Sequence, residues 1–100
     1  QSGANVDGAS QYGWTSLHIA AEGGHLGMIE LLLQSGANVT ATNQDGYTAL
    51  HTAAGNGKLE VAKLLLARGA RPDIRNKFGR TPLDVAQLHG HKEVVAVLER

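Results

Sequence analysis

The stretch TALHTAAGNGK at residues 48–58 decides the fold of this chain. Thr48 stands before an apolar run, and a hydroxyl at that position caps a helix by accepting a hydrogen bond from a backbone N–H of its first turn. Gly55 and Gly57 close the run, because glycine ends helices by adopting conformations that other residues avoid. The stretch therefore predicts a short helix that begins after Thr48 and ends at the glycines.

A second helix is predicted directly after it, in KLEVAKLLLARG at residues 58–69, where Gly69 ends the pattern. Its apolar residues recur at helical spacing and share one face: Leu59, Ala62, Leu65 and Leu66. Turn signals, NQDGY at 43–47 and NKFGR at 76–80, separate one helix pair from the next.

This two-helix unit recurs at an interval of about 33 residues. TSLHIAAEGGH at 15–25 and TPLDVAQLHGH at 81–91 repeat the first helix, and SGANV occurs at both 2–6 and 35–39. One pair of short helices cannot bury its own apolar face, so neighbouring units must stack. The phase divides the chain into the tail of an upstream repeat at 1–8, repeats at 9–41 and 42–74, and a C-terminal capping repeat at 75–100.

The three first-helix stretches resemble the ankyrin signature T-P-L-H-x-A-A-x-x-G-H, and the resemblance covers essentially the whole chain. It implies an all-α fold, an ankyrin-repeat solenoid of stacked helix-turn-helix units with β-turn fingers. It also implies that the fingers and first helices form a concave surface that binds partners. His18 and His51 fall on the signature histidine, for which the resemblance implies hydrogen bonds to the threonine hydroxyl and to neighbouring turn backbone.

Departures from the repeat pattern distinguish the units. Gly27 stands where the later repeats have Glu60 and Glu93, and glycine inside a helix costs about 1 kcal/mol relative to alanine, so the first full repeat should be softer. Polar residues replace apolar ones at three stacking positions of the last unit: Gln87, Lys92 and Glu99. These exchanges suit a solvent-facing terminal repeat, and because the first unit lacks them we expect at least one further repeat upstream.

Composition argues against disulfide-bonded, nucleic-acid-binding, membrane-spanning and catalytic proteins. The 100 residues contain no cysteine, and nine Lys and Arg balance nine Asp and Glu, which gives no reason to expect nucleic acid as a partner. No apolar stretch approaches the roughly 18 residues of a membrane span, so we expect no membrane partner and a location in the cytoplasm or nucleus. We also expect the chain to be a monomer. The five histidines are spread along the repeats and no nucleophile stands beside a base, so the sequence predicts no enzyme, metal or cofactor.

The four aromatic residues all fall on the predicted fingers, where large rings do not build the core. Aromatic and arginine side chains are common hot spots of protein interfaces. With the groove positions that the resemblance implies, the residues expected to bind a partner are Tyr12, Trp14, Glu22, Gln44, Asp45, Tyr47, Asn56, Lys77, Phe78, Arg80, Leu88 and His89. The alternative, that the rings only pack against neighbouring fingers, remains open.

Charge is distributed unevenly along this surface. Every Lys and Arg lies from Lys58 onward, so the surface changes from acidic and aromatic to basic toward the last repeat. A protein or peptide with an acidic segment over the last repeat would complement that gradient. The predicted function is thus non-catalytic protein binding, and the alternative is a structural spacer or capping segment of a larger ankyrin-repeat protein whose binding or catalytic site lies elsewhere.

Overall fold

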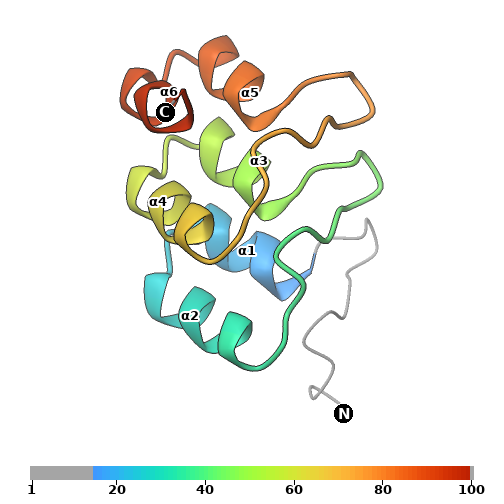
Figure 1. Ribbon diagram of the computed structural model, residues 1–100, viewed down its shortest axis with the longest axis vertical. Helices are drawn as coiled ribbons and strands as arrows, with labels where there is room; N and C mark the ends of the chain where they lie inside the picture. The colour runs from blue at the N-terminus through green and yellow to red at the C-terminus, as the bar shows by residue number, and fades with distance from the viewer. Residues whose placement is uncertain (1–14, 100) are drawn as a thin grey trace.

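The computed structural model describes residues 15–99, and every structural statement below concerns that part of the chain. Its helices are α1 (Ser16–Gly23), α2 (Leu26–Gln34), α3 (Ala49–Gly55), α4 (Leu59–Ala67), α5 (Pro82–Leu88) and α6 (Lys92–Leu98). In Figure 1 the first helices of the three pairs (α1, α3, α5) form one row and the second helices (α2, α4, α6) form another, while the turns that link the pairs extend beside the first row. With no β-strand in the described residues, the predicted all-α solenoid is confirmed.

Each first helix begins with the threonine cap that the sequence predicts. The Thr48 hydroxyl accepts a hydrogen bond from the backbone N–H of His51, and the backbone N–H of Thr48 donates to His51 Nδ1 over 3.0 Å. This reciprocal arrangement satisfies two donors that a helix start would otherwise leave without partners. Thr15 and His18 pair in the same way in α1, and at α5 the carboxylate of Asp84 takes the place of the imidazole.

The second helices carry the larger apolar side chains of the core. Ala62 and Leu65 are buried as predicted, whereas Leu59 and Leu66 are half-buried at the edge of the same layer. Val61, which lies outside the predicted face, is also buried, and its helix packs against α2, α3 and α6. The apolar stripe of α4 is therefore wider than a single row of leucines.

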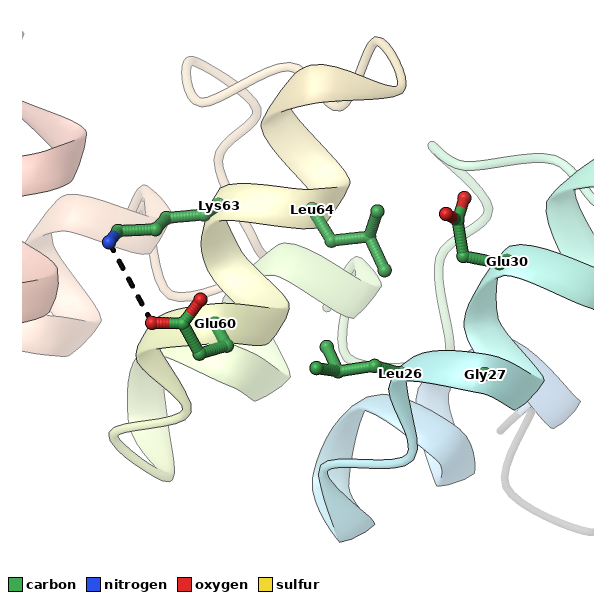
Figure 2. A pocket seen from close by; sticks show the side chains of 6 residues that line it. All are labelled: Leu26, Gly27, Glu30, Glu60, Lys63 and Leu64. Carbon is green, nitrogen blue, oxygen red and sulfur yellow. Dashed lines mark ion pairs between the residues drawn. The ribbon is translucent and has the colours of Figure 1, made fainter.

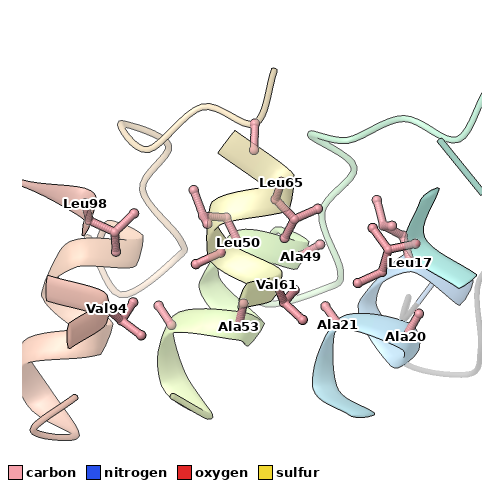
Figure 3. Packing of buried hydrophobic residues seen from close by; sticks show 14 of the residues in the cluster. Leu17, Ala20, Ala21, Ala49, Leu50, Ala53, Val61, Leu65, Val94 and Leu98 are labelled. Atoms are coloured by element: carbon pink, nitrogen blue, oxygen red, sulfur yellow. The ribbon is translucent and has the colours of Figure 1, made fainter. Parts of the chain in front are cut away.

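Small residues let the first helices approach one another. Ala21, Ala53 and Ala54 are fully buried, and with larger side chains from α4 and α6 they form a continuous apolar layer through the stack (Figure 3). One layer shared by all three helix pairs is the solution expected for repeats that cannot bury their own faces.

Polar side chains occupy the far end of the stack. Gln87, Lys92 and Glu99 are exposed, whereas Ala21 and Ala54, the equivalents of Gln87, are fully buried.

In the row of second helices, the guanidinium of Arg68 forms a two-pronged ion pair with the carboxylate of Glu30, at 2.9 and 3.0 Å, and so links α4 to α2. No helix within residues 15–99 is both long and apolar enough to cross a bilayer.

Candidate functional site

The structure divides the predicted binding residues into two groups. Tyr12 and Trp14 lie outside the described residues. Those on the fingers between helix pairs are Gln44, Asp45, Tyr47, Lys77, Phe78 and Arg80, and those at the C-terminal ends of the first helices are Glu22, Asn56, Leu88 and His89. We refer to these as the finger group and the helix-end group.

In each of the two fingers that the structure describes, a buried asparagine accepts backbone hydrogen bonds. Asn43 is 8 % exposed, and its Oδ1 accepts hydrogen bonds from the backbone N–H groups of Asp45 (2.9 Å) and Tyr47 (3.0 Å). Asn76 makes the same two bonds to the second and fourth residues after it. In the sequence both asparagines pass for ordinary turn residues, and the signal that identifies them is the recurrence of N-x-x-G at 43–46 and 76–79. The fingers are thus held from inside, and their intervening side chains face outward or toward a neighbour.

In the first two described helix pairs, a histidine of the first helix is hydrogen-bonded to the following finger. His18 Nε2 lies 2.6 Å from the carbonyl oxygen of Tyr47, and His51 Nε2 lies 2.9 Å from that of Arg80. Since a backbone N–H donates to Nδ1 of each ring, Nδ1 is an acceptor and the Nε2–H must be the donor to the carbonyl. Desolvation by burial lowers the pKa of both histidines, and the bond to the carbonyl opposes this only in part. The role that the family resemblance implied for these residues is confirmed.

Three members of the finger group contact one another. Lys77 Nζ lies 2.7 Å from Asp45 Oδ1 in the preceding finger, and the backbone N–H of Lys77 donates to the Asp45 carbonyl over 2.9 Å. The same ammonium group stands 5.3 Å from the centre of the Phe78 ring, within the range of a cation–π contact. Adjacent fingers are therefore joined by main chain and by side chains, with Phe78 beside the junction.

The two described aromatic rings of the fingers have different surroundings. The ring of Tyr47 is half-buried and lies 5.5 Å from the imidazole of His51, so it packs within the stack. Phe78 remains 56 % exposed although it is a large apolar residue, and Arg80 is exposed two residues later. Packing against the helix of its own repeat thus explains much of the position of the Tyr47 ring, whereas no such contact accounts for the position of Phe78.

The helix-end group offers exposed side chains of mixed character. Leu88 is 60 % exposed, and the next residue, His89, stacks on the ring of His91 with centres 6.2 Å apart. Asn56 is exposed and donates from Nδ2 to the carbonyl of Thr52, while Glu22 is exposed at the end of α1. None of the contacts described joins this group to the finger group directly, so a ligand that touched both would have to bridge them.

Some basic side chains of the last finger are already paired or hydrogen-bonded in the folded protein. Arg71 pairs with Asp73, Lys77 pairs with Asp45, and Arg75 donates to the carbonyl of Gly79. Arg80 has no ion-pair partner within residues 15–99. Its guanidinium is thus the cation of this finger that is most available to a bound carboxylate.

A second surface feature lies away from all the predicted residues. Between α2 and α4 is a shallow depression of about 410 Å³ lined by Leu26, Gly27, Glu30, Glu60, Lys63 and Leu64. Figure 2 shows Leu26 and Leu64 pointing toward each other across it, with the Glu60–Lys63 ion pair at one side. Gly27 adds no side chain to it, a Cβ there would meet no atom within 4 Å, and its carboxylates already have cationic partners in Arg68 and Lys63. This arrangement has no converging groups suited to catalysis.

Among residues 15–99 no cluster of His, Asp or Glu side chains is arranged to hold a metal ion. The two buried histidines are engaged in the hydrogen bonds that join repeats, and His91 Nε2 lies 3.1 Å from the carbonyl oxygen of Gly55 in the preceding repeat. These hydrogen bonds join neighbouring repeats below the exposed fingers and helix ends.

Comparison with known proteins agrees with this geometry. The sequence profile described as ankyrin repeats (many copies) matches residues 1–33, 17–66 and 50–99, in overlapping segments that follow the repeat phase. No curated protein matches the chain. Ankyrin repeats are generally modules of protein–protein interaction and are typically non-catalytic. The chain belongs to the ankyrin repeat family.

Proposed function

We propose that this chain binds a protein or peptide segment, without catalysis, on the concave surface formed by the fingers and the first helices. The observation that carries the proposal is the exposed ring of Phe78, held on a braced finger between the cations of Lys77 and Arg80. Aromatic and arginine side chains are common in interface hot spots.

The bracing of the finger supports this proposal. The Asn76 side chain fixes the backbone N–H groups of Phe78 and Arg80, and His51 holds the Arg80 carbonyl from the preceding repeat. Side chains displayed on such a scaffold lose little conformational freedom when a partner binds. A binding residue placed there contributes more of its contact energy to affinity than one on a loose loop.

Charge favours a partner with an acidic segment over the last repeat. The finger at residues 71–80 carries four basic residues and one carboxylate, whereas its equivalent at 38–47 carries only Asp45. Because Arg80 forms no ion pair within residues 15–99 and attracts Asp84 only at longer range, it would meet an acidic side chain without first breaking an internal ion pair. Such complementarity sets orientation and speeds association more than it raises affinity. Leu88, 60 % exposed, would give the same ligand an apolar contact at the helix-end group.

We further propose that the chain acts as a monomer and needs neither nucleic acid nor a membrane for this binding. The overall charge balance supports the absence of nucleic acid, since nine Lys and Arg are matched by nine Asp and Glu.

The test is a selection of binders from a displayed peptide library rich in aspartate and glutamate, followed by titration of purified variants. Phe78→Ala and Arg80→Ala should each weaken the selected peptide by roughly tenfold, which is about 1.4 kcal/mol. Lys63→Ala on α4 is the matched control, because it removes an exposed cation that lies outside the proposed surface. Equal affinity in all three variants would refute the assignment of the surface, and a library that yields no binder would favour the alternative of a structural spacer.

A further inference from the structure

Two arginines of the last finger, Arg75 and Arg80, are exposed and form no ion pair within residues 15–99. The other two cations of this finger already pair with carboxylates. At the equivalent positions the preceding finger has Thr42 and Tyr47, so the two arginines are a feature of one finger and not of the repeat. We call Arg75 and Arg80 the arginine pair.

The backbone of the finger brings the arginine pair together. The backbone N–H of Asn76 donates to the carbonyl of Arg80 over 2.9 Å, and the N–H of Arg80 donates to Asn76 Oδ1 over 3.1 Å, so the finger closes beside both arginines. Arg75 folds back across the turn, where its Nη1 donates to the Gly79 carbonyl oxygen over 2.8 Å. That oxygen belongs to the peptide bond between Gly79 and Arg80. The Arg75 guanidinium is therefore fixed next to the backbone from which the Arg80 side chain leaves.

The carboxylate of Asp84 is close enough to be influenced by both arginines. The hydrogen bond from the Thr81 backbone does most to lower the pKa of Asp84, and the positive charges of Arg75 and Arg80 lower it further. Asp84 Oδ2 accepts from the backbone N–H of Thr81 over 3.0 Å, and within residues 15–99 Asp84 forms an ion pair with neither arginine. Two guanidinium groups thus share one carboxylate at longer range, which leaves an excess of positive charge at the arginine pair.

The arginine pair offers more hydrogen-bond donors than one carboxylate can accept. A guanidinium presents its N–H groups as a planar fork, and a single fork can engage both oxygens of a carboxylate. The bond to Gly79 uses one N–H of Arg75, so the rest of that group and the whole of Arg80 remain for a ligand. A phosphate monoester carries about two negative charges at neutral pH and three strong acceptor oxygens. It can therefore bond to both forks at once, and a carboxylate cannot.

We propose that the arginine pair binds the phosphate group of a phosphorylated serine or threonine in the partner segment, with Arg75 as a binding residue that the sequence did not predict. The inference rests on the proposed function, because the exposed ring of Phe78 on the same finger would contact the residues that flank the phosphate. A free phosphate ion would make no use of that ring. The neutral overall charge of the chain gives nucleic acid no extended basic surface.

The test compares peptides that differ at one residue. The tightest binder from a phosphoserine peptide library is synthesised again with aspartate or serine in place of phosphoserine, and each peptide is titrated against the 100-residue chain by fluorescence anisotropy. The phosphoserine peptide should bind roughly tenfold more tightly than the aspartate peptide. Equal affinities would overturn this inference, and the proposed function would still stand if Phe78→Ala weakened both peptides. A library that yields no binder would overturn both.

Substitutions at Arg75 separate the planar fork from simple charge. Arg75→Gln should abolish most of the preference for phosphoserine over aspartate, and Arg75→Lys should restore only part of it, because an ammonium group lacks the fork. Arg71→Gln is the matched control, since it removes an exposed arginine of the same finger that already pairs with Asp73, and it should keep the preference. Thermal denaturation midpoints should change little in all three variants because both arginines are exposed. A preference that survives Arg75→Gln, or that Arg71→Gln reduces equally, would overturn the inference.

Competition against the labelled phosphoserine peptide distinguishes other sources of phosphate. Inorganic phosphate should displace the peptide only weakly, and a duplex oligonucleotide should not displace it at an equal concentration. Inorganic phosphate as effective as the unlabelled peptide would show that the site takes the free ion. Displacement by the duplex would identify nucleic acid as the ligand, and either result would overturn the proposal.

Discussion

The Nε2 atom of His51 lies 2.9 Å from the carbonyl oxygen of Arg80, so a buried imidazole in α3 holds the finger that displays Phe78 and Arg80. Its Nδ1 also accepts from the backbone N–H of Thr48 over 3.0 Å, which makes one ring the link between a helix cap and the next repeat. His51 is fully buried, and so the link is shielded from water that could replace it.

Replacing His51 by alanine should lower the free energy of unfolding by about 2 kcal/mol or more, because a buried donor and a buried acceptor lose their partner. Urea denaturation followed by circular dichroism measures this loss. His89→Ala provides the control, since His89 is exposed at the end of α5 and should change the stability little. Equal effects of the two substitutions would show that the cross-repeat bond contributes nothing measurable.

Stability should fall as the pH drops below the ordinary histidine value near 6.5. Burial lowers the pKa of His18 and His51 in the folded protein, so between the folded and unfolded pKa values the unfolded chain binds more protons. The stabilisation is therefore complete above the unfolded pKa and is lost as the pH falls toward the folded one. A proton on Nδ1 would also face the donating backbone N–H of the capping threonine.

Urea midpoints measured from about pH 7.5 down to about pH 5 check this expectation. A double variant, His18→Gln with His51→Gln, should be less stable at neutral pH but should show a flatter profile. The lowered pKa values of Asp73, held by the Arg71 hydrogen bond, and of Asp84, held by the Thr81 backbone N–H, act at more acidic pH and do not enter this window. A profile as steep in the double variant as in the parent would exclude these two histidines as its source.

Alanine substitutions at two equivalent glycines distinguish the stability cost of backbone strain from the cost of a clash between fingers. Gly46 and Gly79 share a φ of +78°, a conformation that costs a non-glycine residue about 1–2 kcal/mol. A Cβ on Gly46 would lie 3.0 Å from the backbone of Asn76 and Lys77, whereas one on Gly79 would meet nothing within 4 Å. Gly46→Ala should therefore destabilise the protein more than Gly79→Ala in thermal or urea unfolding. Similar losses would mean that the fingers move apart at no cost.

Helix caps were predictable from the sequence because each depends on neighbouring residues. The repeat phase was predictable because equivalent residues recur at an interval of about 33 positions. Thr48 and the glycines after it determine the start and the end of α3 by local chemistry alone. The exposed stacking residues of the first unit were not predictable in this way. Ile19 and Val85 occupy equivalent apolar positions, and whether such a residue is buried depends on the presence of a neighbouring repeat.

The sequence identifies the candidate residues by their positions in the repeat, but it does not predict what surrounds each side chain in the fold. Tyr47 and Phe78 are both aromatic finger residues, yet the first ring lies against His51 and the second is exposed. The difference arises because the Tyr47 ring lies beside a histidine of the helix that follows it, while Phe78 precedes the finger glycine and lies beside Lys77. Similarly, Lys77 is a binding candidate by sequence, but its ammonium group is already paired with Asp45.

Gly27 gives a stabilising substitution that the sequence suggested and the structure refines. It is the second residue of α2, in the first turn, where glycine costs at most the roughly 1 kcal/mol relative to alanine that it costs in a helix interior. A Cβ there would meet no atom within 4 Å, so Gly27→Ala should raise the free energy of unfolding by up to about 1 kcal/mol, with slower amide exchange in α2. The reciprocal change Glu60→Gly, at the equivalent position of α4, should lower stability by a similar amount, because the Glu60–Lys63 pair that it also removes is exposed and weak. A destabilised Gly27→Ala variant would contradict the open depression between α2 and α4, since only a group occupying that space could oppose one added methyl.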